Sequence, residues 1–364
     1  MAVGFPTKVS YANGDVFSAS DINDTNGTIN LLQTSTLSRA AGKNAIINGG
    51  MDVWARGTSF ALAATVPTYT ADRWYNARSA TGQTVSRQVT GDTTNLPNIQ
   101  YCARVQRDNA NTSTAEVRLA QAFETVNSIP LAGQVVTLSF YARRGANYSS
   151  ASNFLGSQII IGTGTDQNAL TGGYTGQSTL SSATPTLTTT WQRFTQTATI
   201  PATATEITTL FTYTPVGTAG AADYFEVTGV QLELGSYATT FSRAGGTMQG
   251  ELAACQRYYY RLTAVANNAA IGLGFGTSSI NSRQFTSLPV EMRVTPTSIE
   301  YSTLEIGDNV NPAIDVTTAT LNVASNTRVG ALSVDVASGA TAYRPYALRL
   351  KTATTSFLGF SAEL

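Results

Sequence analysis

Residues 229–262, GVQLELGSYATTFSRAGGTMQGELAACQRYYYRL, mark the point where one β-rich block of this chain ends and another begins. Val230, Leu232 and Leu234 alternate with polar residues or glycine. A period of two is typical of a β-strand with one buried face. The first part of the segment is therefore interpreted as the closing strand of a β-sandwich.

The periodicity changes after the glycine pair at positions 245 and 246. Leu252, Cys255 and Tyr259 are spaced as residues on one face of a helix. This spacing predicts a short helix of about two or three turns that starts near Thr247. The helix would open the second block, residues 244–364.

The preceding block, residues 44–243, carries several alternating runs separated by Gly, Asn, Asp or Pro. In one of them, Val136, Leu138, Phe140 and Ala142 share a face. Further strands are expected at residues 159–161, 191–200, 207–213 and 225–234. Many short strands at close spacing predict an all-β fold with an antiparallel sandwich or jelly roll.

Trp54, Trp74 and Trp191 each lie in a strand-like run of this block. Two roles are open to them: large aromatic side chains of the core, or exposed platforms for sugar rings. Burial of a large aromatic side chain stabilises a fold by several kcal/mol at ordinary area coefficients, roughly 25 cal/mol per Å². We therefore favour the core.

In the last block, the stretch IGLGFG at residues 271–276 has glycine at every second position. It is not a phosphate-binding loop, because no Lys-Ser/Thr pair follows and no G-x-G-x-x-G pattern fits. We expect a strand in which glycine allows another backbone to come close. A further strand is expected where Val290, Met292 and Val294 alternate between Pro289 and Pro296.

Residues 1–43 read as an extended arm followed by a helix. Ser20 is a plausible N-cap, and apolar or small residues follow at heptad spacing, namely Ile22, Thr25, Ile29, Leu32 and Thr36. Two interpretations stay open: a single helix lying on a neighbouring protein, or a parallel three-helix bundle. In the second, Ile22, Ile29 and Leu32 form the seam of a homotrimer.

Composition limits the partners. The chain has 364 residues, a formal net charge of +0 and only 12% charged residues. This balance gives no basic surface that would indicate binding to nucleic acid. A weakly charged polar surface is typical of a subunit that is part of an assembly. No signal peptide or membrane-spanning run is evident, so folding in a cytoplasm without membrane insertion is expected. Cys102 and Cys255 fall in different blocks and are expected to be buried free thiols.

The chain contains no histidine. This excludes Ser-His-Asp and Cys-His nucleophile systems and the usual histidine-containing zinc sites. Carboxylate pairs, as used in glycoside hydrolysis, remain, and candidates in the middle block are Asp52, Asp72, Asp223, Glu226 and Glu233. These acids are scattered, and we expect them to be solvated or paired with arginine. We expect no enzyme activity and no cofactor.

Four short patterns carry a resemblance to a known class of proteins. They are YANGDVFSASDIND at residues 11–24, L-E-L-G-x-x-A-T-x-F with E-L-x-x-C-Q-R-Y-Y at residues 232–259, L-P-V-x-M-R-x-T-P at residues 288–296, and FSAEL at residues 360–364. Together they resemble tail fibre proteins of tailed bacteriophages. The resemblance implies a C-terminal β-sandwich packed in threes, and an N-terminus that docks to tail or portal/adaptor proteins through Tyr11, Gly14, Asp15, Asp21 and Asn23.

The middle block carries a second resemblance. Its opening Asn48-Gly49-Gly50, its aromatic strands and its closing L-E-L-G are similar to carbohydrate-binding jelly-roll modules. In those modules the first and last strands can share a structural calcium, which here implies Asp52 and Glu233 as ligands. The alternative is one surface carboxylate and one bonded to Arg56 or Arg73.

The expected function is that of a tail fibre subunit, which is made in the bacterial cytoplasm, becomes part of the virion and binds a glycan or protein on the host surface. Tyr301, Tyr343 and Tyr346 are the candidates for receptor contact at the C-terminal tip. The alternatives are a head fibre, decoration or adaptor protein and a tailspike-type glycan hydrolase. A further alternative is a secreted bacterial sugar-binding protein, but such a protein should carry an export signal.

Overall fold

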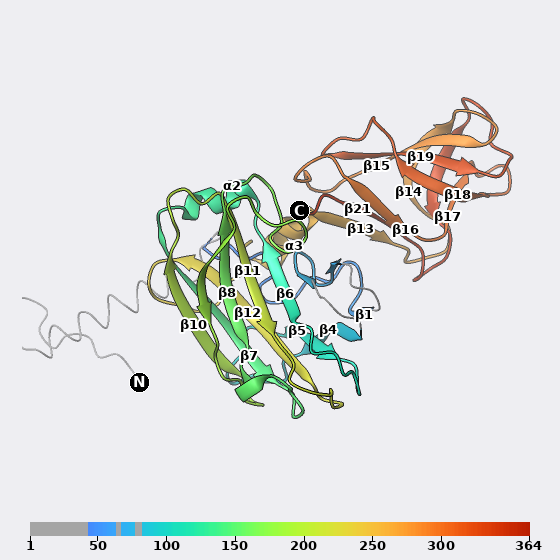
Figure 1. Cartoon of the computed structure of the whole chain (residues 1–364). Helices are drawn as coiled ribbons and strands as arrows, with labels where there is room; N and C mark the ends of the chain where they lie inside the picture. The colour runs from blue at the N-terminus through green and yellow to red at the C-terminus, as the bar shows by residue number, and fades with distance from the viewer. Residues whose placement is uncertain (1–42, 63–66, 77–81) are drawn as a thin grey trace, which may run out of the picture.

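The computed structural model describes residues 43–62, 67–76 and 82–364 (Figure 1). The predicted docking residues Tyr11, Gly14, Asp15, Asp21 and Asn23, and the predicted seam residues Ile22, Ile29 and Leu32, lie outside these ranges. No helix within the described residues is long and apolar enough to cross a membrane.

The middle block, residues 44–243, is a sandwich of two antiparallel six-stranded sheets. The first sheet has the order β1 (Ser59–Leu62), β4 (Gln83–Val89), β5 (Tyr101–Arg107), β12 (Tyr224–Leu234), β7 (Val135–Arg144), β10 (Gln192–Thr199). The second has the order β2 (Thr68–Tyr69), β3 (Tyr75–Asn76), β6 (Val117–Ala122), β11 (Glu206–Tyr213), β8 (Gly156–Gly162), β9 (Ser178–Ala183). Short helical turns are α2 (Thr125–Ser128), η1 (Ile129–Leu131) and η2 (Ala151–Asn153). The predicted all-β fold is confirmed.

The space between the two sheets is filled by the predicted apolar faces. Val136, Leu138, Phe140 and Ala142 all point into this core and are at most 1% exposed. Trp54 and Trp74 belong to the same core, while Trp191 packs in a smaller cluster around Leu96, Ile99 and Cys102. All three tryptophans are therefore core residues, which confirms the role that we favoured from the sequence.

Strand β12 differs from the expected strand with one buried face. Val230 and Leu232 are buried in the core, but Gln231 and Glu233 on the other face are also buried, and Leu234 is 57% exposed. Residues 235–243 fold over that second face, where the Ser242 N–H donates to Gln231 at 2.8 Å. A polar strand face is buried here because its hydrogen bonds are satisfied by this segment.

Helix α3 (Met248–Gln256) begins where the sequence predicted. The Thr247 side chain accepts a hydrogen bond from the Gly250 N–H and caps the first turn. Cys255 is buried as a free thiol, as is Cys102, which confirms that expectation. Tyr259 was expected on the helix, but the helix ends first and Tyr259 begins strand β13 (Tyr259–Thr263).

The C-terminal block, residues 244–364, contains a three-stranded sheet and a closed six-stranded barrel, where a β-sandwich was expected. The sheet has the order β13, β21 (Phe357–Ser361), β16 (Ser298–Tyr301). The barrel consists of β14 (Ala269–Gly276), β15 (Asn281–Ser287), β19 (Val329–Val336), β18 (Ile314–Leu321), β17 (Leu304–Gly307) and β20 (Pro345–Leu350).

The glycine-rich strand β14 closes the barrel by pairing with both β15 and β20. A Cβ atom at Gly274 would lie 1.8 Å from the Arg283 carbonyl oxygen, so only glycine allows this approach. The strand predicted between Pro289 and Pro296 is absent: these residues form an irregular crossing from the barrel to the three-stranded sheet. The backbone N–H groups of Met292 and Arg293 donate instead to the carbonyls of Thr327 and Arg257, so the run forms no ladder with a neighbouring strand.

Candidate functional site

The outward face of the second sheet of the middle block forms the floor of a cleft. In β8, Ile159 and Ile161 point into the core, so Gln158 and Ile160 point outward. The register places Leu210 of β11 directly beside Gln158. Figure 1 shows β6, β11 and β8 side by side. The floor therefore combines aliphatic side chains with an amide group.

One wall of the cleft is the loop of residues 163–177, here termed the wall loop. Its residues 169–173 line the cleft, and Gln177 and Thr179 lie where the chain enters β9. Tyr174 anchors the loop from below, because its hydroxyl donates to the Ile207 carbonyl at 3.0 Å. The cleft has a volume of about 510 Å³, within the range of roughly 300–1,000 Å³ that is usual for ligand sites.

The opposite rim of the cleft carries an ion pair. Arg118 Nε donates to Glu116 Oε2 at 2.6 Å, and the Thr212 hydroxyl donates to the other Glu116 oxygen. Both charged side chains are about one third exposed, at 37% for Arg118 and 30% for Glu116. The positive and negative charges compensate each other at this rim, so the cleft presents polar groups without a net charge.

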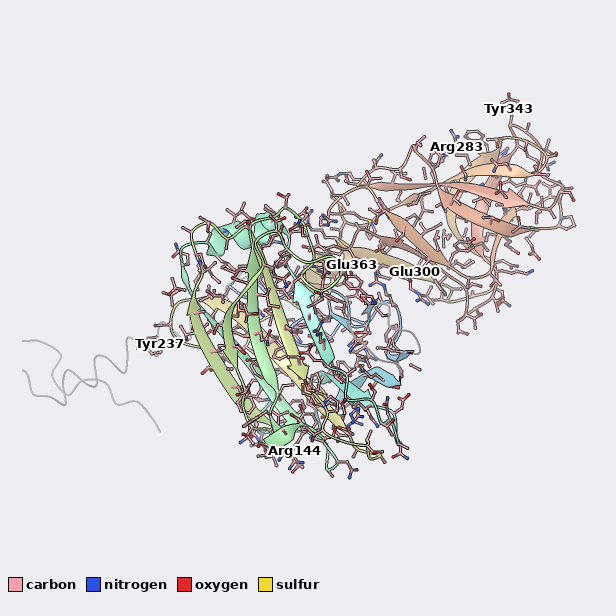
Figure 2. All side chains as sticks on the ribbon, viewed as in Figure 1. Arg144, Tyr237, Arg283, Glu300, Tyr343 and Glu363 are labelled. Atoms are coloured by element: carbon pink, nitrogen blue, oxygen red, sulfur yellow. The ribbon has the colours of Figure 1, made fainter. Side chains whose placement is uncertain are left out.

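A second feature is a buried joint between the two blocks, formed by Arg56, Arg73, Tyr258, Tyr259 and Glu363. Glu363 forms ion pairs with both Arg56 and Arg73, although 290 residues separate it from Arg73. The guanidinium of Arg73 lies 3.5 Å from the ring centre of Tyr258, and that of Arg56 lies 3.4 Å from the ring centre of Tyr259. In Figure 2 Glu363 lies between the blocks.

Two of the sequence patterns that carry the tail fibre resemblance meet at this joint. CQRYY supplies Tyr258 and Tyr259, and FSAEL supplies Glu363. These two motifs contribute to packing between the blocks, a role that sequence spacing could not show.

Asp72, beside the joint, is buried, and its Oδ1 accepts a hydrogen bond from the Ala55 N–H at 2.8 Å. Burial raises the pKa of Asp72 to about 6, against the opposing effect of Arg56. Because its folded pKa lies above the unfolded value near 3.8, the folded state binds a proton more tightly. The contribution to stability therefore falls as pH rises from about 4 to about 6.

We predict that Asp72→Asn removes this pH dependence, since asparagine can still accept from Ala55. Relative to wild type, the variant should gain about 2–3 kcal/mol of unfolding free energy between pH 4 and pH 7, at roughly 1.4 kcal/mol per pKa unit. Urea unfolding of both proteins at the two pH values measures this difference. An equal offset at both pH values would contradict the raised pKa.

The predicted receptor residues are placed differently from one another. Tyr343 is 89% exposed and lies at the far end of the barrel (Figure 2). Tyr346 is 4% exposed, and its hydroxyl accepts from the Thr341 N–H, so the expectation of an exposed ring is wrong there. Tyr301 is half-buried against the barrel core, and its hydroxyl accepts from the Ala319 N–H. The rings of Tyr301 and Tyr346 can be buried against the barrel core because their hydroxyls form hydrogen bonds with backbone N–H groups.

Asp52 and Glu233, the candidate calcium ligands, are engaged by different cations. Asp52 pairs with Arg243 at 2.8 Å, where Arg56 or Arg73 had been the alternative partners. Glu233 is buried and pairs with Lys43 at 3.4 Å. Within the described residues, no group of three or more Cys, Asp or Glu is placed to hold a metal ion. We therefore do not propose a calcium site.

The other acids of the middle block are mostly paired with arginine, as expected. Asp223 pairs with Arg107, and Glu226 lies between Arg104 and Arg143. Both carboxylates are fully buried. Each serves as the counter-ion of a guanidinium, which is a structural role.

The cleft residues were not identified from the sequence. The alternation of Gln158 and Ile160 with Ile159 and Ile161 does indicate which side chains point outward. It does not indicate that β11 lies between β6 and β8, because neither pairing joins strands that are consecutive in the sequence. The position of the wall loop over the sheet carries no local signal at all.

No family model matches the sequence, and no curated protein matches it. Among solved structures, a protein described as "CBM4 structure and function" has 16% identity and a TM-score of 0.31, covering 52% of this chain and 98% of that chain. The xylan-binding domain of a family 22 carbohydrate-binding module has 15% identity and a TM-score of 0.28, covering 50% and 97%.

The enzymatically active domain of tailspike protein 4 from bacteriophage CBA120 has 11% identity and a TM-score of 0.32. The match covers 53% of this chain and 21% of that one. This chain is thus similar, over about half its length, to carbohydrate-binding modules and to part of a phage tailspike. Identities and TM-scores this low establish neither a family nor a function.

Proposed function

We propose that this chain is a tail fibre subunit of a tailed bacteriophage and that its middle block binds a host-surface glycan in the cleft. The observation that carries the proposal is the lining of the cleft. Amide and hydroxyl groups of Gln158, Gln177, Thr171 and Thr179 surround a floor that includes Ile160. A sugar ring offers hydroxyls at its edge and C–H groups on its faces, and this lining matches both.

The charge of the rim favours a neutral sugar. Arg118 is compensated by Glu116, so an anionic sugar would have to compete with an existing ion pair. No aromatic ring is among the described residues that line the cleft. Binding would then rest on hydrogen bonds, each worth about 0.5–1.5 kcal/mol net, so a single cleft would bind weakly.

Weak binding at one site suits a fibre. We propose a homotrimer that is attached to tail or portal/adaptor proteins through residues 1–43, as the sequence resemblance implies. Several clefts on one fibre, and several fibres on one virion, would then bind a repeating glycan with an avidity well above the single-site affinity.

We propose binding without catalysis. Glycoside hydrolysis requires two carboxyl groups that flank the scissile bond. Glu116 is the carboxylate among the described lining residues, and it already accepts hydrogen bonds from Arg118 and Thr212. Incubation with host polysaccharide should release no reducing ends, and their release would support the tailspike-type hydrolase instead.

The test is Gln158→Ala, measured by calorimetry against oligosaccharides from the host envelope. The outward-facing amide can be removed without disturbing the core, so we expect an affinity about fivefold to tenfold weaker, the value of one hydrogen bond. Gln192→Ala removes an exposed amide from β10 of the other sheet and should leave the affinity unchanged. Equal affinities for Gln158→Ala and wild type would refute binding in the cleft.

The position on the virion is tested separately. Labelled antibodies against the chain should decorate the tail of intact particles. Decoration of the head would support the alternative of a head fibre or decoration protein, with the same cleft.

A further inference from the structure

The wall loop is held from two sides, and the first is the middle block itself. The Thr125 N–H donates to Asp166 Oδ1 at 2.9 Å, and the Asp166 N–H donates to the Thr125 hydroxyl at 2.8 Å. These reciprocal bonds fix the base of the loop. They do not reach residues 169–173, which line the cleft.

The second side is the C-terminal block, through one arginine. Arg293 Nη1 donates to the remaining oxygen of Asp166 at 2.8 Å. The same guanidinium donates from Nε to the Ala362 carbonyl at 2.9 Å and from Nη2 to the Glu363 carbonyl at 3.2 Å. Its side chain is only 9% exposed. The planar guanidinium thus ties the wall loop to the chain that follows β21.

Leu364 makes a further connection. Its carbonyl accepts from the Tyr69 hydroxyl at 3.1 Å and from Asn168 Nδ2 at 3.5 Å. Leu364 and Leu170 pack against the same apolar cluster on the outer face of the sheet, which includes Ile160 of the cleft floor. The C-terminal block therefore contacts both the wall loop and the apolar layer beneath it.

We infer that the C-terminal block holds the wall loop in the conformation that forms the cleft, with Arg293 and Asp166 as positioning residues. The inference rests on the proposed glycan binding for its functional consequence only. It predicts that substitutions at this contact weaken glycan binding although Arg293 does not line the cleft. The site would thus belong to both blocks.

Asp166→Asn tests the contact with Arg293 most selectively. Asp166 has a positive φ of 50°, a conformation that asparagine adopts readily, and the new side chain can still accept from Thr125. The oxygen that faces Arg293 becomes an amide NH2 group, so both the charge and the acceptor for the Arg293 guanidinium are lost. Hydrogen exchange of the amides in residues 167–173 should become about threefold to tenfold faster, because local opening becomes easier. Glycan affinity should fall by about threefold.

Arg293→Gln should give the same changes, and the double variant should be less than additive, since both substitutions remove one interaction. Arg293→Lys should restore part of the affinity. The matched control is Glu291→Gln, which removes the exposed ion pair with Arg328 and touches no part of the wall loop. It should leave loop exchange and affinity unchanged.

Unchanged loop exchange in Asp166→Asn and Arg293→Gln would overturn the inference, as would faster exchange with unaltered glycan affinity. If wild type binds no glycan, the proposed function fails, and the exchange measurement still decides whether the C-terminal block holds the loop.

Discussion

Glu363→Gln is expected to lower the free energy of unfolding by about 3–5 kcal/mol, since removing one partner of a buried ion pair leaves the other charge uncompensated. Here two guanidinium groups lose their counter-ion. The side chains of Arg73, Arg56 and Glu363 are 2%, 7% and 5% exposed. Burial would lower the pKa of Arg73, but Glu363 and the neighbouring tyrosines raise it, so the arginine stays charged.

Because the joint connects the two blocks, the loss should appear as a separate, earlier transition in urea unfolding followed by circular dichroism and tyrosine fluorescence. Glu291→Gln is again the matched control, since its ion pair with Arg328 is exposed. It should cost less than about 1 kcal/mol. Equal effects of the two substitutions would show that the joint does not depend on the buried charge.

Asp223→Asn should have an effect of similar size inside the middle block. Asp223 is fully buried and accepts from Arg107 Nη1 at 2.7 Å, from the Ser149 hydroxyl at 2.7 Å and from the Ser149 N–H at 3.0 Å. Arg107 in turn donates to the carbonyls of Asn111, Ser113 and Gly217. The carboxylate and the guanidinium thus hold several connecting segments together at the ends of β5 and β12.

Asparagine keeps the shape of the side chain. Its NH2 group, however, would face the donors of Arg107 or Ser149, and Arg107 would lose its counter-ion. The expected loss is about 3–5 kcal/mol of unfolding free energy, measured by urea denaturation at pH 7. Asp315→Asn removes the exposed pair with Lys351 and should cost less than about 1 kcal/mol. A loss below 1 kcal/mol for Asp223→Asn would contradict the role assigned to this pair.

Much of the fold could be predicted from short-range pattern. The alternation around Val136 to Ala142 identified β7 and its core face, and the change of period after position 245 placed α3. Alternation failed where both faces of a strand are buried, as at Gln231, because a partner segment covers the second face. It failed again between Pro289 and Pro296, where an alternating run has no neighbouring strand to pair with.

The site was less predictable, because it depends on which distant segments meet. Tyr343 and Tyr346 are three positions apart in sequence, yet one is exposed and the other is in the barrel core. Glu363 and Arg73 attract each other across the joint, but neither has a local signal for that contact. The cleft likewise requires four strands and one loop, and its residues become neighbours only in the folded sheet.

The most direct test of glycan binding in the cleft is hydrogen exchange of the full chain with and without host-envelope polysaccharide. If the glycan binds in the cleft, exchange should become slower in residues 168–179 and in the flanking parts of β8 and β11. Protection confined to the barrel end around Tyr343, with none at the cleft, would contradict binding in the cleft and place recognition at the tip.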